Sequence, residues 1–237
     1  MPLPEGSDQT YPYRAHAEYI YAAGEECAGG VVAFDPREAS AGWRTFVPPV
    51  TEAESVWEGR RPSAGDSIEA LPAWLEARRD RPVVTLGTAS PTAGTETARE
   101  IFTELRRAKD GHELSLIRRA VDATAAGHAL VSGLIRAGVT ERQIQIELEA
   151  EFFRHGGNRT GYGTIVGAGS NSAVLHFAPS RREIREGDFV LVDAGAEVDR
   201  YVADVTRTHV AGHPTGFQRD LHQAVVRTLD RAIARCV

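Results

Sequence analysis

The spacing of apolar residues changes near residue 160, and this change limits the folds open to the chain. Before it, two stretches start with helix-capping patterns, Asp110 with Glu113 and Thr140 with Gln143. Apolar or small residues follow each pattern at steps of three and four, as on the buried face of an amphipathic helix. The first face comprises Leu114, Ile117, Val121, Thr124, His128, Val131 and Ile135, and the second comprises Ile144, Leu148 and Phe152. We therefore predict two consecutive amphipathic helices.

After residue 160 the pattern is that of β-strands, in which apolar and polar residues alternate. Segments 173–177, 189–195 and 201–210 predict strands, and the last two form a hairpin in this prediction. Residues 217–237 return to four-residue steps and predict a final helix. Together these elements describe a second domain over residues 109–237.

The first hundred residues favour a smaller unit of mixed type. Segments 30–35, 43–47 and 82–87 are apolar runs bounded by Gly, Pro and Asp, which is typical of strands. Residues 66–79 have helical spacing, and residues 98–108 predict a connecting helix. The sequence thus predicts an α/β domain over residues 1–108.

Composition excludes several functional classes. The net charge of −6 and the pI of about 5.8 give no basic surface for nucleic acid. The sequence has no apolar run long enough to span a membrane and no signal peptide pattern. Cys27 and Cys236 are too far apart to suggest a disulfide framework, so we expect a cytoplasmic protein that binds neither nucleic acid nor membrane.

The predicted hairpin carries two aspartates, Asp193 and Asp204. If the turn is centred on residues 198 and 199, Asp193 faces Asp204 directly. If it is centred on residues 199 and 200, Asp204 is diagonal to Asp193. Both registers put the two carboxylates on one face, because side chains alternate along a strand. A three-residue turn would instead separate them.

Two carboxylates at such a distance repel each other unless a proton or a cation lies between them. Oxygen ligands of this kind suit Mn²⁺ or Mg²⁺, and two such ions can polarise a carbonyl and acidify a bound water. The alternative is a pair of solvated carboxylates at the end of a hairpin. Spacing alone leaves both possibilities open.

Two further residues are candidates. His176 lies among apolar neighbours in a predicted strand, either as a buried histidine bonded to a carbonyl or as a proton donor to a developing oxyanion. Trp57 lies beside the basic pair Arg60 and Arg61, either as a partly buried surface residue or as part of a site that grips a carboxylate.

Several segments together resemble the pita-bread metallopeptidase family, and most closely bacterial Xaa-Pro aminopeptidases, relatives of prolidase and creatinase. The similarity extends from Tyr11 to Val237. Its segments are 11–14, 56–61, 109–114, 138–141, 153–156, 164–167, 175–177 and, most specifically, 192–197 followed by 201 and 204–208.

This resemblance implies a small creatinase-like N-terminal α/β domain followed by the first half of a pita-bread catalytic domain, an α/β (α+β) fold. It implies that Asp193 and Asp204 bind two divalent metal ions, usually manganese, and that His176 bonds the substrate or the tetrahedral intermediate. The implied substrate is a peptide with proline at its second position. Trp57 is implied to reach the active site of a neighbouring subunit, which would make the protein a homo-oligomer.

The sequence also departs from the family pattern. A histidine and two glutamates that complete the metal centre in the family come from the second half of the catalytic domain, which these 237 residues do not contain. Arg200 replaces a common glycine, and His209 a common aromatic residue. We therefore expect either an aminopeptidase completed by a C-terminal polypeptide or a truncated module that binds peptides or a protein without catalysis. Creatinase-like hydrolysis without metal is a third possibility, which the two retained aspartates disfavour.

Overall fold

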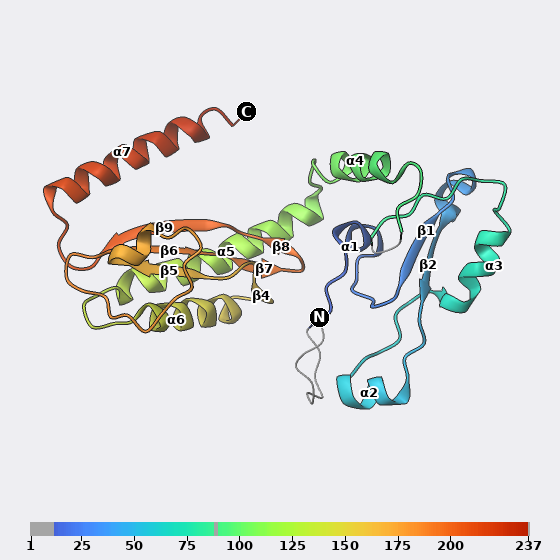
Figure 1. The fold of residues 1–237 in the computed structure, drawn as a ribbon, viewed down its shortest axis with the longest axis horizontal. Helices are drawn as coiled ribbons and strands as arrows, with labels where there is room; N and C mark the ends of the chain where they lie inside the picture. Colours follow the sequence, from blue (N-terminus) through green and yellow to red (C-terminus); the bar gives the residue numbers. More distant parts are fainter. Residues whose placement is uncertain (1–11, 88–89, 237) are drawn as a thin grey trace. The chain divides into compact units, whose positions relative to one another are not determined.

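A computed structural model describes residues 12–87 and 90–236, so Tyr11 and Val237 lie outside the described residues. The chain divides into two compact units, residues 1–108 and residues 109–237, and each is described by itself. Mixed helices and strands make this an α/β fold, as predicted (Figure 1).

The first unit is built on a small mixed sheet. Its strands β1 (Val31–Phe34), β2 (Trp43–Val47) and β3 (Asp66–Ser67) lie in that order, β1 antiparallel and β3 parallel to β2. Its helices are α1 (Ala17–Ala23), α2 (Glu52–Glu58), α3 (Leu71–Glu76) and α4 (Thr95–Leu105), with 3-10 segments at Pro36–Gly42 and Ile68–Ala70. Phe46 on β2 is almost fully buried and packs edge-on against Trp74 of α3.

The predicted strand at residues 82–87 is wrong. Val83 and Val84 are about half exposed, and no strand forms there. Thr85 instead bonds locally: its amide donates to Oγ1 of Thr92 at 3.0 Å, and its carbonyl oxygen accepts from Oγ1 of Thr95 at 3.0 Å. Hydroxyl side chains therefore satisfy backbone groups that a sheet would otherwise have to pair.

Two helices form one layer of the second unit. Both predicted capping boxes are present, at the start of α5 (Gly111–Leu134) and of α6 (Glu141–Arg154). Ile144, Leu148 and Phe152 of α6 are fully buried, as predicted.

The predicted buried face of α5 is partly wrong. Leu114 and Val121 are exposed, and the small residues Ala120, Ala123 and Gly127 are buried instead. A Cβ atom at Gly127 would lie 2.5 Å from the ring of Phe152. Close packing of α5 on α6 therefore selects the face with the smallest side chains rather than the most apolar one.

The strands of the second unit form two short sheets. In one sheet β5 (Ile165–Ala168), β6 (Phe189–Ala194) and β9 (Val205–Val210) lie in that order, all antiparallel. In the other, β4 (Arg159–Thr160), β7 (Ala196–Val198) and β8 (Tyr201–Val202) do the same. The buried side chains of β5, β6 and β7 share one core with α5 and α6.

The predicted C-terminal helix is confirmed as α7 (Gly216–Ile233). Of its described residues only Gln218 is buried, and Nε2 of Gln218 donates to the carbonyl oxygen of Gly187 at 2.9 Å. Its apolar side chains are exposed: Phe217, Leu221, Val225, Val226, Leu229 and Ile233. Among the described residues, no helix combines the length and the apolar character needed to cross a bilayer.

Candidate metal centre

The hairpin between β6 and β9 has the second of the two predicted registers. Asp193 pairs with Thr206, which places Asp204 diagonal to Asp193 and on the same face of the ribbon. The turn residues are Asp199 and Arg200, with φ angles of 46° and 75°. Two successive left-handed residues match the right-handed twist of the flanking strands. Arg200, at the position where glycine is common, therefore adopts the conformation that glycine favours.

The ribbon bends at Gly195, between the two aspartates along the chain. Gly195 separates β6 from β7, and a Cβ atom there would lie 1.6 Å from the carbonyl oxygen of Ala203. Only glycine permits this approach of the two backbones. The amide of Gly161 donates to the carbonyl oxygen of Gly195 at 2.8 Å, which brings the segment before β5 to the bend.

A tyrosine on this neighbouring segment joins the two aspartates. The hydroxyl of Tyr162 lies 2.6 Å from Oδ1 of Asp193 and 3.0 Å from Oδ1 of Asp204. The two carboxylates, eleven residues apart in the sequence, thus converge on a single atom. This arrangement is the central observation of the structure.

The phenol has one proton for two acceptors, so it can satisfy only one carboxylate oxygen at a time. Burial, followed by the hydrogen bonds and negative charges of Asp193 and Asp204, raises the pKa of Tyr162 well above 10.0. The hydroxyl therefore stays protonated and neutral. The two carboxylates beside it then place two negative charges close together. A divalent cation is the natural partner for such charge density.

Tyr162 was not among the residues predicted from the sequence. The residue lies between Gly161 and Gly163, just before β5, where no periodic pattern exists. A possible signal was a lone aromatic residue in a glycine-rich segment next to the motif that carries the resemblance. Spacing could not show which side chain it would meet.

Helix α5 holds the bend from the opposite side with two polar residues one turn apart. Oγ1 of Thr124 accepts from the amide of Ala196 at 2.9 Å, and Nε2 of His128 donates to the carbonyl oxygen of Ala194 at 3.2 Å. Both side chains are buried. They bond the residues on either side of Gly195 and so attach this part of the ribbon to α5.

His128 is uncharged in this position. Burial lowers its pKa below the ordinary 6.5, despite the opposing hydrogen bond to Ala194. Burial also lowers the pKa of His209 on β9, and the nearby His128 and Arg207 add to that effect. A neutral His128 with a proton on Nε2 has an unprotonated Nδ1, which is buried without a hydrogen-bond partner.

His176 is not in a strand, so that prediction is wrong. Residues 169–173 form a 3-10 helix, and His176 lies in the loop that follows, exposed and without a hydrogen bond within the described part of the chain. Val174 and Leu175 are 52% and 87% exposed, so no apolar layer covers this segment as a strand would require. The alternative of a buried histidine bonded to a carbonyl is thereby excluded.

Trp57 lies on α2 in the first unit and is 81% exposed. Its basic neighbour Arg60 pairs with Glu54 of the same helix. One of the two arginines that could bind a ligand carboxylate is therefore already paired with Glu54. The structure supports an exposed tryptophan rather than a partly buried one.

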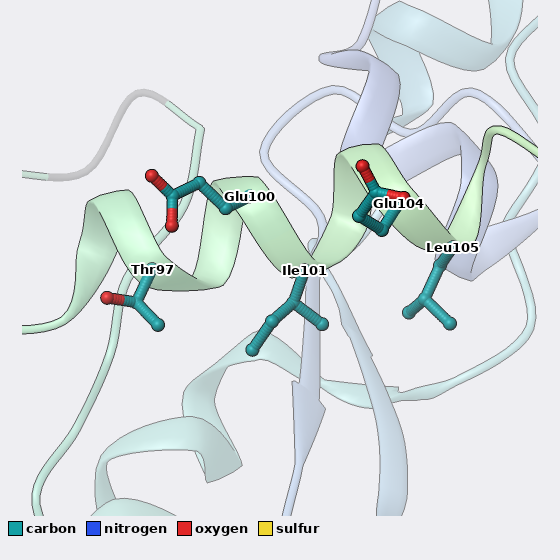
Figure 2. A pocket seen from close by; sticks show the side chains of 5 residues that line it. All are labelled: Thr97, Glu100, Ile101, Glu104 and Leu105. Atoms are coloured by element: carbon teal, nitrogen blue, oxygen red, sulfur yellow. The ribbon is translucent and has the colours of Figure 1, made fainter.

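A hollow of 420 Å³ lies along α4 in the first unit and is a poor candidate for chemistry. Figure 2 shows the side chains of Ile101 and Leu105 along α4, with those of Glu100 and Glu104 beside them on the same helix. The hollow is wide open to solvent, and its polar groups do not converge on a point. Enclosed sites with converging polar groups are the usual places of catalysis.

The carboxylate pair fits part of a divalent metal site. Asp193 and Asp204 offer up to four oxygens on one face of the hairpin. Within residues 12–87 and 90–236, no group of three or more His, Cys, Asp or Glu residues could hold a metal ion. Asp193 and Asp204 are therefore the two carboxylate ligands that this part of the chain offers at the hairpin.

Comparison with known proteins identifies the family. The model of metallopeptidase family M24 matches residues 115–237. The chain is 38% identical to the Xaa-Pro aminopeptidase of Escherichia coli K12 over 57% of its length, and 30% identical to Xaa-Pro aminopeptidase 2 of Streptomyces coelicolor over 96%. It spans 31% of the first relative and 56% of the second, less than two thirds of either.

Solved structures show the same fold. Aminopeptidase P from E. coli superposes with a TM-score of 0.83 at 24% identity, covering 98% of this chain and 62% of that one. Proline aminopeptidase P II from Yersinia pestis gives 0.81, also at 24% identity, over 96% of this chain and 61% of that one. The resemblance drawn from the sequence motifs is confirmed, and the chain belongs to metallopeptidase family M24.

Proposed function

We propose that this protein is part of a metal-dependent Xaa-Pro aminopeptidase, which hydrolyses the peptide bond before proline. The observation that carries the proposal is the convergence of Asp193 and Asp204 on the hydroxyl of Tyr162. The relatives named Xaa-Pro aminopeptidase support the substrate class.

Each residue has a role that follows from its position. Asp193 and Asp204 bind the divalent ions, for which manganese is our first choice because the known donors are all oxygens. Bound ions would polarise the scissile carbonyl and make a bound water nucleophilic at neutral pH. Tyr162 holds the two carboxylates in one geometry, and Gly195 with its bonds to α5 keeps their strands aligned.

His176 supplies a hydrogen bond to the substrate or to the oxyanion that forms from it. Its exposed position on a loop leaves the ring free to meet a peptide. A donor aimed at a developing oxyanion lowers the barrier because it is stronger in the transition state than in the ground state.

The proposal includes an organisation of the chain. Residues 1–108 are the creatinase-like N-terminal domain, and residues 109–237 are the first half of the catalytic domain. The remaining metal ligands come from residues beyond these 237, in the same polypeptide or in a complementing C-terminal one. The donor count supports this, because four carboxylate oxygens are too few to bind two cations tightly.

In this proposal the protein is a homo-oligomer, and Trp57 of one subunit binds the substrate in the active site of a neighbouring subunit. Its 81% exposure supports a role outside its own unit. Both Cys27 and Cys236 are free thiols, which agrees with the cytoplasm as the site of action.

The proposal is tested by hydrolysis of a Xaa-Pro tripeptide in manganese buffer by the protein together with its C-terminal half. Asp193→Ala should lower kcat at least a hundredfold, because it removes a metal ligand. Asp220→Ala, an exposed residue of α7, is the matched control and should keep wild-type turnover. Wild-type turnover in Asp193→Ala would exclude the proposed site.

A second function is favoured by the exposed apolar side chains of α7. These could bind a protein or peptide without any catalysis. The two functions differ in one result: the non-catalytic module gives no hydrolysis in manganese buffer even when the C-terminal half is present.

A further inference from the structure

The loop that carries His176 has little structure of its own. Residues 174–179, which we call the His176 loop, contain no helix or strand, and Leu175 at its tip is 87% exposed. The amide of Val174 donates to the carbonyl oxygen of Asn171 at 3.1 Å. The position of His176 therefore depends on the two stems that enter and leave the loop.

One buried carboxylate contacts both stems. Glu141, the first residue of α6, is fully buried. Its Oε1 accepts from the amide of Ala168 at 2.8 Å and from Nδ2 of Asn171 at 2.9 Å, both on the stem before the loop. Its Oε2 accepts from the amide of Ser180 at 3.1 Å and from Oγ of Ser180 at 2.6 Å, on the stem after it.

The chemistry of this position requires a carboxylate. Four donors meet on two oxygens, which matches the number of lone pairs that a carboxylate offers. Burial raises the pKa of Glu141, but the bonds from Ser180, Ala168 and Asn171 outweigh it and hold the pKa below its ordinary value. The group is therefore ionised at neutral pH, at a helix N-terminus that favours negative charge.

The charge has no cationic partner within the described part of the chain, since all four donors to Glu141 are neutral groups. Burying an ion without a counter-ion is unfavourable unless its hydrogen bonds compensate. The carboxylate sets the separation of the two stems, because its two oxygens lie a fixed distance apart and each binds one stem. The second stem is also bonded to α6 through the backbone, from the amide of Arg142 to the carbonyl oxygen of Ser180 at 2.9 Å.

From this arrangement we infer that Glu141 is a positioning residue for His176, which fixes the separation of the two stems of the His176 loop and thereby the place of the imidazole. The inference rests on the proposed function for the role of His176, but the clamp itself can be tested without it. Glu141 touches neither substrate nor metal in this account.

The first test uses the isotope-labelled 237-residue chain. In Glu141→Gln an amide nitrogen with two N–H donors replaces one of the two oxygens that each accept two hydrogen bonds. The amides of Ala168 and Ser180 should then exchange with solvent at least tenfold faster, and the ring signals of His176 should shift and sharpen. Glu147→Gln, an exposed residue of the same helix, is the matched control and should leave both unchanged. Unchanged exchange and unchanged His176 signals in Glu141→Gln would overturn the inference.

Two milder variants keep the test decisive if Glu141→Gln does not fold. Asn171→Ala removes a donor from the first stem, and Ser180→Ala removes a side-chain donor from the second. Each should shift the His176 signals while the amides of β6 and β9 keep their protection. Wild-type His176 signals in both variants would contradict the clamp.

The catalytic arm uses the chain together with its C-terminal half and a Xaa-Pro tripeptide. Glu141→Gln should lower kcat about tenfold or more with little change in KM, because a misplaced donor weakens the transition state more than the ground state. If the wild type shows no hydrolysis, the proposed function fails while the exchange data still test the clamp. If the wild type is active and Glu141→Gln keeps full kcat, the positioning role alone fails.

Discussion

Tyr162 is the side chain on which the account depends most, because its one hydroxyl contacts both aspartates. A metal site built only from two aspartates on a hairpin would hold its ligands loosely. A phenol between them sets their separation before any ion arrives. Such preorganisation is what a tight and specific site requires.

The raised pKa of Tyr162 predicts a dependence of stability on alkaline pH. The folded-state pKa lies above the unfolded value of 10.0, so the stabilisation is fully present below pH 10 and is lost as the pH rises further. In metal-free buffer the urea midpoint of the wild type should fall more steeply from about pH 10 to about pH 12 than that of Tyr162→Phe. Tyr21→Phe, in the other unit, is the control and should keep the wild-type slope. If the urea midpoint of Tyr162→Phe falls with pH as steeply as that of the wild type, Tyr162 is not buried between the two aspartates.

The sequence predicted part of this site. Alternation along strands placed Asp193 and Asp204 on one face for both two-residue turns considered, but not for a three-residue turn. It could not choose the register, since the left-handed turn at Asp199 and Arg200 contains no glycine to reveal it. Tyr162 and Glu141 stayed hidden for another reason: each bonds residues distant in sequence, and no local pattern records such contacts.

Among the secondary-structure elements, α5 has a role beyond packing. Its apolar spacing predicted a helix, but the predicted buried face was wrong at Leu114 and Val121. Packing on α6 and on the strands buried the small residues of α5, and Thr124 and His128 bond the residues that flank Gly195. The spacing of apolar residues predicts that a helix forms more reliably than it predicts which face of that helix is buried.

The bond from Ala196 to Thr124 gives a prediction for this helix. Thr124→Val keeps the shape of the side chain but leaves a buried amide unpaired, which should lower the free energy of unfolding by about 1–3 kcal/mol. Thr124→Ser keeps the hydroxyl and should recover more than half of that loss. Chemical denaturation of the two variants measures the difference, and equal stabilities would show that the bond does not hold the bend.

The bend itself gives a second prediction. Gly195→Ala places a methyl group against the carbonyl oxygen of Ala203 and should lower the free energy of unfolding by at least about 2 kcal/mol. Gly133→Ala in α5 meets no atom within 4 Å, and it should instead raise the free energy of unfolding by about 0.5–1 kcal/mol. Thermal unfolding of both variants provides the measurement, and a stable Gly195→Ala would contradict the close approach of the two strands.

The second unit combines a buried core with a largely exposed helix. Residues of α5, α6 and the strands share that core, whereas α7 exposes an apolar row along its length. The chain also spans only 31–56% of two named relatives. The partial coverage supports the proposal that further residues complete the metal centre, and the apolar row on α7 is a surface that such residues or a separate partner could cover.

The helices of the second unit were predictable because capping boxes and long periodic runs are strong local signals, whereas the strand predicted at 173–177 was wrong and β5 was not predicted. The first unit was harder. Its helices α2 and α3 are short, and the segment 82–87 has a strand-like composition but bonds through threonine hydroxyls. Local composition cannot distinguish a strand from an extended segment whose backbone is satisfied by side chains.

The most direct measurement is the effect of Mn²⁺ on the amide NMR signals of the 237-residue chain, because a paramagnetic ion broadens nearby signals even when it binds weakly. The account predicts that low concentrations of Mn²⁺ broaden the signals of Asp193, Ala194, Asp204 and Val205 first, and that Asp193→Asn combined with Asp204→Asn abolishes this effect while Asp220→Asn does not. Selective broadening that persists in the double variant, or that begins elsewhere in the chain, would contradict the claim that this carboxylate pair binds a divalent metal.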